Sequence, residues 1–439
     1  MAKKKHTPPI IPRAFWRAHK HQDAATQMLQ AAREFGSFVK NGVLGEYYFV
    51  ADADAIQHIL VSDRDHYEKT PFLFNRMGRL MGQGLLTNLT ESWLPRRKLL
   101  QKLFTREYLN AYAQQTIDNM PAFLEDWEVR AKKNVSINVY DEMMMLILMN
   151  VCRHFLSDTL SRDKARRLVK AVAFAQAGIC SQFILSPYFP TPTFLRFRYG
   201  VWKMDQYVTG LIEARQRMTG HSSDLLTLLM EQGISQQEML DEGKTFIVAG
   251  HETTGTALTW CFHLLMKHQA VYQQLQEEVW RVVGQKTLSI EDLDQLPFVQ
   301  AVLEESLRLY PPIWGLPRRL MQPDTLLGYD MPKGAHFIIS PYAMHRLEKY
   351  WDEPDVFNPA RFMGENRKKI FNNAYLPFSL GPHRCIAAQL ALRQAQIVLA
   401  MIAQRFSLER VSINTDPMPQ ELHITMRPLE AIMARVILS

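Results

Sequence analysis

A single cysteine near the C-terminal end stands in a loop that is suited to offer a thiolate to a metal. Cys385 lies within the run FSLGPHRCIA of residues 378–387, where Gly381 and Pro382 indicate a tight loop. Residues 386–406 are mostly apolar and predict a buried helix. A thiolate at the start of a helix meets unpaired N–H groups and the positive end of the helix dipole, which favour the ionised sulfur that binds metals. The alternative is a small, buried, unreactive cysteine.

An acid followed by an alcohol lies in the middle of a long predicted helix. Residues 235–238, SQQE, fit a capping box, and the helix is expected to reach Lys267, roughly 50 Å further on. Its centre, residues 249–256, reads AGHETTGT, in which two glycines and three threonines are poor helix formers. Glycine lets a flat ligand approach, and Glu252 with Thr253 would make a short proton relay. A buried kink is the alternative, and Gly255 excludes a zinc-protease HExxH motif.

Two further helices pair residues on one face. Trp93 and Arg97 are four apart, and an indole N–H with a guanidinium suits a buried carboxylate. The next helix starts at Pro297, and its Glu305 and Arg308 are three apart. On their own, the first pair is also compatible with an ordinary surface helix and the second with a surface salt bridge.

These four patterns, in their order along the chain, resemble the cytochromes P-450 over roughly residues 46–428. The cysteine loop is similar to their haem-binding loop, with Ala387 where glycine is usual, and residues 249–254 match their oxygen-activation motif. Glu305 and Arg308 resemble a buried pair that a second arginine, Arg361 of the run PARF, joins to lock the cysteine loop. Ala360 stands where that run commonly has glutamate.

The resemblance implies a mainly helical, triangular domain with small β-sheets, in a soluble, bacterial-type member without a membrane anchor. It also implies an enzyme that inserts one oxygen atom of O2 into a lipophilic substrate by hydroxylation or epoxidation. Glu252 would help to bring in protons, and Thr253 would hydrogen-bond the oxygen being activated. The cofactor would be haem b, held by Trp93, Arg97, Ala249, Gly250, Arg318, Phe378, Gly381, His383, Cys385 and Ala387, with Cys385 as the iron ligand.

The substrate pocket is the least determined part of this expectation. A fatty acid, a terpene and a polyketide all remain open. By family position, the pocket would be lined by Phe72, Phe74, Met77, Met81, Phe246, Trp314 and Leu316, although core packing explains several of them equally well.

The composition fits one large globular domain. The 439 residues are 47% hydrophobic and 22% charged, with no linker, repeat or low-complexity stretch. We therefore expect a single haem-thiolate domain over residues 1–439, with residues 1–13 as a basic, flexible tail. Strands are expected at 45–50, after the prolines at 311–312, at 423–427 and at 431–438.

Charge and cysteine usage limit the location and the partners. Four widely spaced cysteines without a CxxC pair argue against a disulfide framework and a zinc site, and favour the cytoplasm. No apolar segment follows the basic N-terminus, so we expect neither signal peptide nor transmembrane segment, and only peripheral membrane contact. The net charge is +7, but no nucleic-acid motif accompanies it, so nucleic acid is not an expected partner.

Electrons are expected from a separate protein, because no Gly-x-Gly-x-x-Gly follows a predicted strand. A ferredoxin or flavodoxin with its reductase would serve, so NAD(P)H would act only indirectly, on an enzyme that we expect to be a monomer. The candidate docking residues are Arg96, Lys98, Lys102, Arg106, Lys368, Lys369, Arg384 and Arg393. Two alternatives are a peroxide-driven haem-thiolate enzyme, against which Glu252 and Thr253 argue, and a haem sensor, whose second axial ligand the Ala249–Gly250 surface does not supply.

Overall fold

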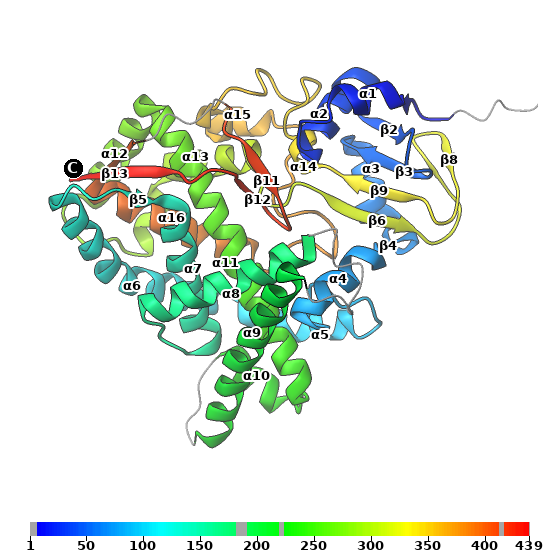
Figure 1. The fold of residues 1–439 in the computed structure, drawn as a ribbon. Coiled ribbons are helices and arrows are strands. Elements are labelled where there is room, and N and C mark those ends of the chain that lie inside the picture. Colours follow the sequence, from blue (N-terminus) through cyan, green and yellow to red (C-terminus); the bar gives the residue numbers. More distant parts are fainter. Residues whose placement is uncertain (1–6, 181–190, 219–223, 412–416, 439) are drawn as a thin grey trace, which may run out of the picture. The chain divides into compact units, whose positions relative to one another are not determined.

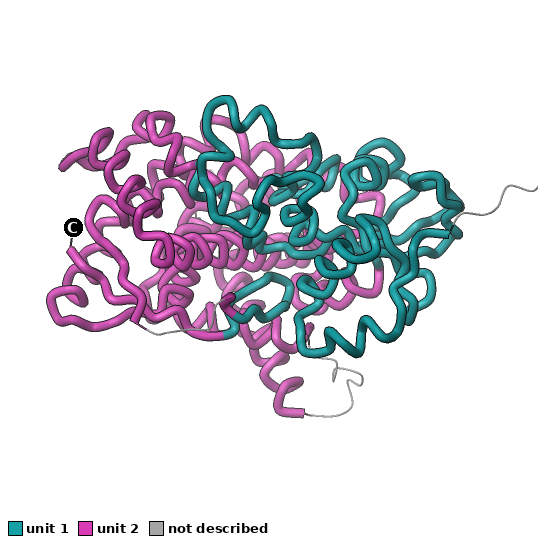
Figure 2. Tube along the Cα trace, turned by 90° about the horizontal axis from the view of Figure 1, so that it is seen from above, with its two compact units in different colours: residues 1–70, 301–386, 419–429 teal, residues 71–300, 387–418, 430–439 magenta. Residues whose placement is uncertain are grey.

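Helices dominate the fold, and the strands form small sheets (Figure 1). The computed structural model describes residues 7–180, 191–218, 224–411 and 417–438. These residues group into two compact units (Figure 2). Unit 1 comprises residues 1–70, 301–386 and 419–429, and unit 2 comprises 71–300, 387–418 and 430–439. That the whole chain acts as one domain stays a prediction.

Unit 1 is built on a mixed sheet with the strand order β1-β2-β3-β9-β6-β4. β3 runs parallel to β9, with Tyr47 opposite His336, whereas β9 and β6 are antiparallel. The strands are β1 (Ile10–Ile11), β2 (Phe38–Asn41), β3 (Tyr47–Val50), β4 (Tyr67–Lys69), β6 (Leu316–Leu320) and β9 (His336–Ile339), and two hairpins add β7 (Asp324–Leu326), β8 (Tyr329–Met331), β11 (Gln420–Leu422) and β12 (Met426–Pro428).

Short helices complete unit 1. They are α1 (Arg13–Ala18), α2 (Ala24–Phe35), α3 (Ala53–Gln57), α14 (Pro341–Met344) and α15 (Gly364–Lys368), with single turns at His58–Ser62, Arg64–His66 and Pro359–Phe362. One apolar core joins the sheet to the segment before the cysteine loop, with Phe337, Ile339 and Leu376 almost fully buried in it. The sheet therefore supports that segment directly.

Unit 2 is almost entirely helical. Its helices are α4 (Pro71–Met81), α5 (Trp93–Leu100), α6 (Arg106–Lys132), α7 (Val139–Leu156), α8 (Arg162–Cys180), α9 (Pro192–Arg217), α10 (Leu225–Glu231), α11 (Gln236–Lys267), α12 (Gln269–Val283) and α16 (Ala388–Arg405), with single turns at Gln101–Phe104 and Glu291–Gln295. In unit 2, strands β10 (Phe406–Arg410), β13 (Met433–Leu438) and β5 (Ile137–Asn138) form a sheet in that order. Helix α13 (Pro297–Leu309) contributes residues to both units.

Several predicted boundaries are confirmed. Helix α11 begins after Ser235, whose hydroxyl accepts from the Glu238 N–H while the Glu238 carboxylate accepts from Ser235, so the capping box is present. Helix α13 spans Pro297–Leu309 as expected. The strand expected at 423–427 is confirmed only in part, because β12 begins at Met426 and residues 423–425 connect it to β11.

The prediction of a flexible tail over residues 1–13 also needs correction. Ile10 and Ile11 pair with Lys40 and Asn41 in the unit 1 sheet, and α1 begins at Arg13. Ile11 is fully buried, and the strand satisfies backbone hydrogen bonds, so this segment belongs to the fold. Residues 1–6 lie outside the described residues.

Candidate active site

The loop that carries Cys385 is closed by backbone hydrogen bonds. The Cys385 N–H donates to the Phe378 carbonyl at 2.9 Å. Gly381 has a φ of +68°, and a Cβ there would lie 1.9 Å from the carbonyl oxygen of Leu60. Glycine is therefore required at this position for both its backbone conformation and its close approach. The loop holds Cys385, His383 and Arg384 with exposed side chains.

The helix after the cysteine starts slightly later than expected. Helix α16 begins at Ala388, three residues beyond Cys385, and its N-cap, Ala387, makes no side-chain capping bond. Cys385 thus precedes the first turn rather than lying in it. The helix itself is buried along most of its length, as its apolar sequence predicts.

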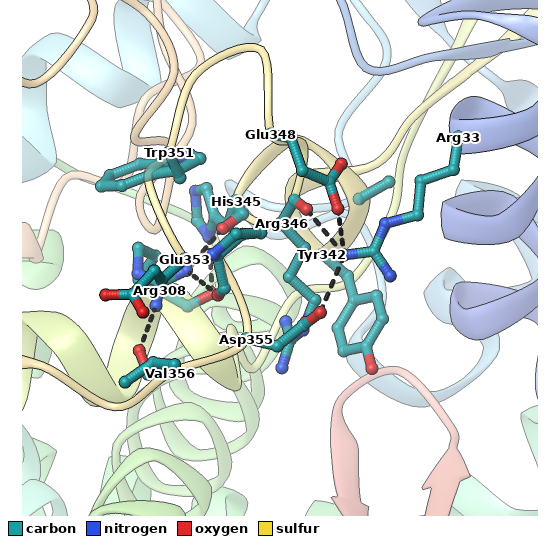
Figure 3. Close-up of polar contacts among 12 residues, drawn as sticks. Arg33, Arg308, Tyr342, His345, Arg346, Glu348, Trp351, Glu353, Asp355 and Val356 are labelled. Atoms are coloured by element: carbon teal, nitrogen blue, oxygen red, sulfur yellow. Dashed lines mark hydrogen bonds and ion pairs between the residues drawn. The ribbon is translucent and has the colours of Figure 1, made fainter.

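A buried arginine holds unit 1 together behind this loop. Glu305 and Arg308 are fully buried and form a two-point ion pair, with Arg308 Nε and Nη2 at 2.7 and 2.8 Å from the carboxylate oxygens. Arg308 also donates to the carbonyls of His345, Pro354 and Val356 at 2.7, 2.6 and 3.1 Å (Figure 3). All five N–H donors of the guanidinium are therefore used.

The predicted second arginine joins the same carboxylate. Arg361 Nε lies 3.4 Å from a Glu305 oxygen, which also accepts from the Asn358 N–H at 2.9 Å. Arg361 donates in addition to the Glu353 carbonyl at 2.8 Å. The structure thus brings Glu305, Arg308 and Arg361 together, and Ala360 does not prevent it.

A histidine that the sequence did not indicate connects this cluster to the cysteine loop. His345 is fully buried, its Nδ1 lies 3.1 Å from the Arg308 carbonyl, and its Nε2 accepts from the Leu376 N–H at 2.8 Å. Because Nε2 is an acceptor, Nδ1 carries the proton and donates. Burial and the nearby Arg308 lower the pKa of His345 to about 3, so the ring is neutral. Leu376 in turn accepts from the Ser379 N–H inside the loop.

Arg318 is a buried cation without an acidic partner. It lies on β6 and is 5% exposed, and its hydrogen bond is to the Pro317 carbonyl at 2.9 Å. Among the described residues, no carboxylate comes within ion-pair distance of it, and burial lowers the pKa of its guanidinium to about 10. A buried cation of this kind needs a negative group, which is consistent with the predicted contact to a haem propionate.

Helix α11 has one stripe that the protein leaves partly uncovered. Between Asp241 and Met266, the only residues that are not buried are Ala249, Gly250 and Thr253. These positions share one face of a helix. The Thr253 hydroxyl donates to the Ala249 carbonyl at 2.8 Å, and the helix continues through this bond without a break. Such a stripe can accept a flat ligand.

Beside this stripe, the acid and the histidine point into the core of unit 2. Glu252 is 2% exposed, and its carboxylate accepts from Gln176 of α8, a contact that no sequence pattern indicated. His251 is equally buried and hydrogen-bonds the Ile247 carbonyl at 2.6 Å. Burial lowers the pKa of His251 to about 4, so it is neutral and faces away from the stripe of its neighbours.

The glycines of this motif have a packing role in unit 2. A Cβ on Gly250 would lie 3.2 Å from Val151, and one on Gly255 would lie 2.9 Å from Met144, both on α7. Glycine therefore lets α7 and α11 approach each other closely. Contact of Gly250 with a flat ligand stays a prediction.

On α5, Trp93 and Arg97 are both partly exposed and lie one turn apart. Arg96, which lies between them, has a side chain that is only 10% exposed and is ion-paired with Glu238 of α11. Arg96 is therefore not available as a surface residue for a docking partner, and we remove it from that set.

The residues predicted to line a pocket lie in different settings. Phe74, Met77 and Met81 are buried on one face of α4, whereas Phe72 is 71% exposed and has Arg76 over its ring. In other parts of the chain, Phe246 packs on Phe155 and Phe104, the Trp314 N–H donates to the His423 carbonyl, and Leu316 lies in β6 opposite Ile339. The exposure of Phe72 contradicts a pocket role, and the other assignments stay predictions.

Among the described residues, no group of three or more His, Cys, Asp or Glu side chains is arranged to hold a metal ion. A haem brings its own nitrogen ligands and needs one side chain such as Cys385. In the described ranges, none of the helices is both long and apolar enough to cross a bilayer.

Comparison with known proteins gives consistent results. The family model described as Cytochrome P450 matches residues 5–434. Cyclooctat-9-en-7-ol 5-monooxygenase of Streptomyces melanosporofaciens is 29% identical, over 83% of this chain and 80% of its own. Pentalenene oxygenase of Streptomyces avermitilis is 27% identical, over 84% of this chain and 82% of its own. A solved structure, that of the cytochrome P450DA heme domain, covers 100% of this chain and 99% of its own with a TM-score of 0.89 and 23% identity, and supports the fold.

Proposed function

Because the chain belongs to the cytochrome P450 family, we propose that it is a haem-thiolate monooxygenase that inserts one oxygen atom of O2 into a lipophilic substrate. The observation that carries the proposal is the accessible Cys385 on a loop that hydrogen bonds hold in place. When bound, the haem supplies the redox chemistry that activates O2.

The side chains of this chain have separate tasks in the proposal. Cys385 would ligate the iron, and Arg318, Trp93 and Arg97 would bind the propionates by charge-assisted hydrogen bonds. Thr253 offers its hydroxyl on the uncovered stripe of α11, and Glu252 delivers protons from the buried side of that helix. Glu305, Arg308 and Arg361 are structural, since every donor of Arg308 is spent inside unit 1.

We propose the substrate and the redox partners by their class. Relatives named for cyclooctat-9-en-7-ol and pentalenene support a lipophilic compound of that kind. We propose that electrons come from a ferredoxin or flavodoxin with its reductase, that NAD(P)H acts only through them, and that the protein is a cytoplasmic monomer with at most peripheral membrane contact.

The first experiment is the carbon-monoxide difference spectrum of the haem-loaded, dithionite-reduced protein. We expect the red-shifted Soret band that thiolate ligation produces, and its loss in Cys385→Ser. A band of the histidine type, or an unchanged band in Cys385→Ser, would overturn the assignment of Cys385.

The same preparation separates the two alternatives. A haem sensor with a second protein ligand would not bind carbon monoxide readily. A peroxide-driven enzyme would give the same spectrum as a monooxygenase but would turn over with hydrogen peroxide and not with O2 and reduced partner. The buried Glu252 and the hydroxyl of Thr253 favour the O2-dependent reaction.

A prediction for Thr253 follows from its place on the uncovered stripe. Thr253→Val keeps the shape of the side chain and removes the hydroxyl, so protons are delivered less selectively and more O2 leaves as hydrogen peroxide. We expect the yield of peroxide per NAD(P)H consumed to rise at least about threefold, because general acid–base contributions of single groups are typically larger than that.

The matched control is Thr259→Val. Thr259 lies on the same helix and makes the same bond to the carbonyl one turn earlier, Gly255 at 2.7 Å, but it is fully buried. We expect it to leave the peroxide yield unchanged. Equal yields from both variants would show that only helix stability had been altered.

A further inference from the structure

The net charge of the chain is concentrated on two neighbouring helices of unit 2. Helix α8 and the part of α9 up to Lys203 contain eight basic residues and one acidic residue, Asp163. Their net charge of +7 equals that of the entire chain. The two helices pack side by side (Figure 1). The exposed basic side chains are Lys164, Arg166, Arg167, Lys170, Arg196, Arg198 and Lys203.

An apolar stripe runs along the outer face of α9 among these cations. Leu195, Tyr199 and Trp202 follow the spacing of one helical face and are 56%, 49% and 51% exposed. The Lys203 ammonium lies 4.8 Å from the ring centre of Trp202 and 5.7 Å from that of Tyr199. Large apolar side chains gathered on an exposed face usually mark a binding surface.

The packing of α9 does not require this stripe. Phe197, Met204 and Val208 on the other side of the helix are buried, and Gly200 is in close contact with Ala171 of α8. The core contacts of α9 are thus made by different residues from those that face outward. Helix α9 therefore has two apolar stripes. One is buried in unit 2, and the described residues leave the other uncovered.

We propose that this surface, formed by the exposed basic residues of α8 and α9 with Leu195, Tyr199 and Trp202, binds the surface of an anionic lipid bilayer. Trp and Tyr with flanking Lys and Arg is the composition of helices that lie in a membrane interface. Each basic residue close to an anionic membrane raises binding roughly fivefold, so seven give strong attraction. The proposal does not depend on the haem chemistry.

The test uses the haem-loaded full chain and sedimentation with vesicles. The probes are vesicles of phosphatidylcholine alone and of phosphatidylcholine with phosphatidylglycerol. We expect binding to the anionic vesicles only, and a fall of at least about tenfold when salt is raised from low to about 0.5 M. Binding to both vesicle types alike, or to neither, overturns the proposal.

Two variants locate the surface, and two controls lie elsewhere. Arg196→Glu with Lys203→Glu, and separately Tyr199→Ala with Trp202→Ala, should each weaken binding at least about tenfold without altering haem content. The controls are Lys333→Glu and Trp280→Ala. Trp280 on α12 is 56% exposed, much like Trp202. Equal loss in the controls would show that binding does not depend on this surface, and so contradict the proposal.

A direct contact measurement completes the test. Brominated lipids quench tryptophans that enter the interface, so quenching should fall in Trp202→Phe and persist in Trp280→Phe. The opposite pattern would place a different face on the membrane. If the chain binds an acidic protein column but no vesicle, the surface serves a protein partner and the lipid proposal is wrong.

Discussion

Replacing Arg308 by lysine is expected to destabilise the protein by about 3–5 kcal/mol and to reduce its haem content severely. Lysine retains the charge but has three donors in place of five, so it cannot pair both oxygens of Glu305 and still reach the carbonyls of His345, Pro354 and Val356. Buried acceptors without donors are costly. The measurements are the free energy of unfolding in urea and the molar ratio of haem to protein.

Arg367→Lys is the matched control, because Arg367 makes the same two-point contact with the neighbouring Glu304, at 2.6 and 2.8 Å, but is half-exposed. Exposed ion pairs contribute little, so a loss of about 1 kcal/mol or less is expected, with full haem content. If Arg308→Lys binds haem fully and is no less stable than this control, the Arg308 cluster does not support the cysteine loop.

The residues that the sequence identified correctly share a local signal. The capping box at Ser235 and the proline at 297 act within a few residues, so the starts of α11 and α13 could be predicted closely. The family, confirmed by the match over residues 5–434, could be recognised because its motifs are short and contiguous. Local spacing also placed Glu305 and Arg308 on one helical face.

What the sequence did not predict depends on contacts between distant segments. Gln176 meets Glu252 across 76 positions, and His345 reaches Leu376 across 31. No spacing rule encodes such pairs. The exposure of Phe72, unlike these contacts, follows from local spacing. Phe74, Met77 and Met81 lie on one helical face, and Phe72 falls outside it. Helical periodicity alone could therefore have removed Phe72 from the pocket.

The loop between α4 and α5 makes a further contact that the sequence did not predict, and this contact makes stability depend on pH. The N–H groups of Gln83 and Leu85 donate to the buried carboxylates of Asp241 and Glu242 on α11, at 2.8 and 3.1 Å. Gly82 has a φ of +66°, and a Cβ there would collide with Asp241. The loop is thus held closely against α11 within unit 2.

The burial of Glu242 in this contact shifts the pKa of its carboxyl group. Burial raises the pKa of Glu242 to about 7 from an ordinary value of 4.5, with smaller increases from Asp241 and Glu238, although the Leu85 N–H and Arg96 lower it. Protonated Glu242 therefore stabilises the folded state. This stabilisation is complete below pH 4.5 and is lost as the pH rises through 7.

We therefore expect Glu242→Gln to gain stability over the wild type as the pH rises. The amide still accepts from Leu85 but never ionises, so the difference in unfolding free energy should grow by about 2 kcal/mol between about pH 5.5 and about pH 8.5. Urea titrations of both proteins at the two pH values give this difference. Amide exchange at Gln83 and Leu85, corrected for its intrinsic pH dependence, should show that the wild-type loop opens more readily at the higher pH.

Glu238→Gln tests whether this effect belongs to Glu242 or to the shared partner. Glu238 also pairs with Arg96 but is half-exposed, and hydrogen bonds from Ser235 lower its pKa. It is ionised at both pH values and has the smallest of these influences on the pKa of Glu242, so the stability difference between Glu238→Gln and the wild type should be nearly the same at each. If Glu242→Gln also differs from the wild type by a constant amount, Glu242 ionises at its ordinary pKa and its burial does not make the loop contact sensitive to pH.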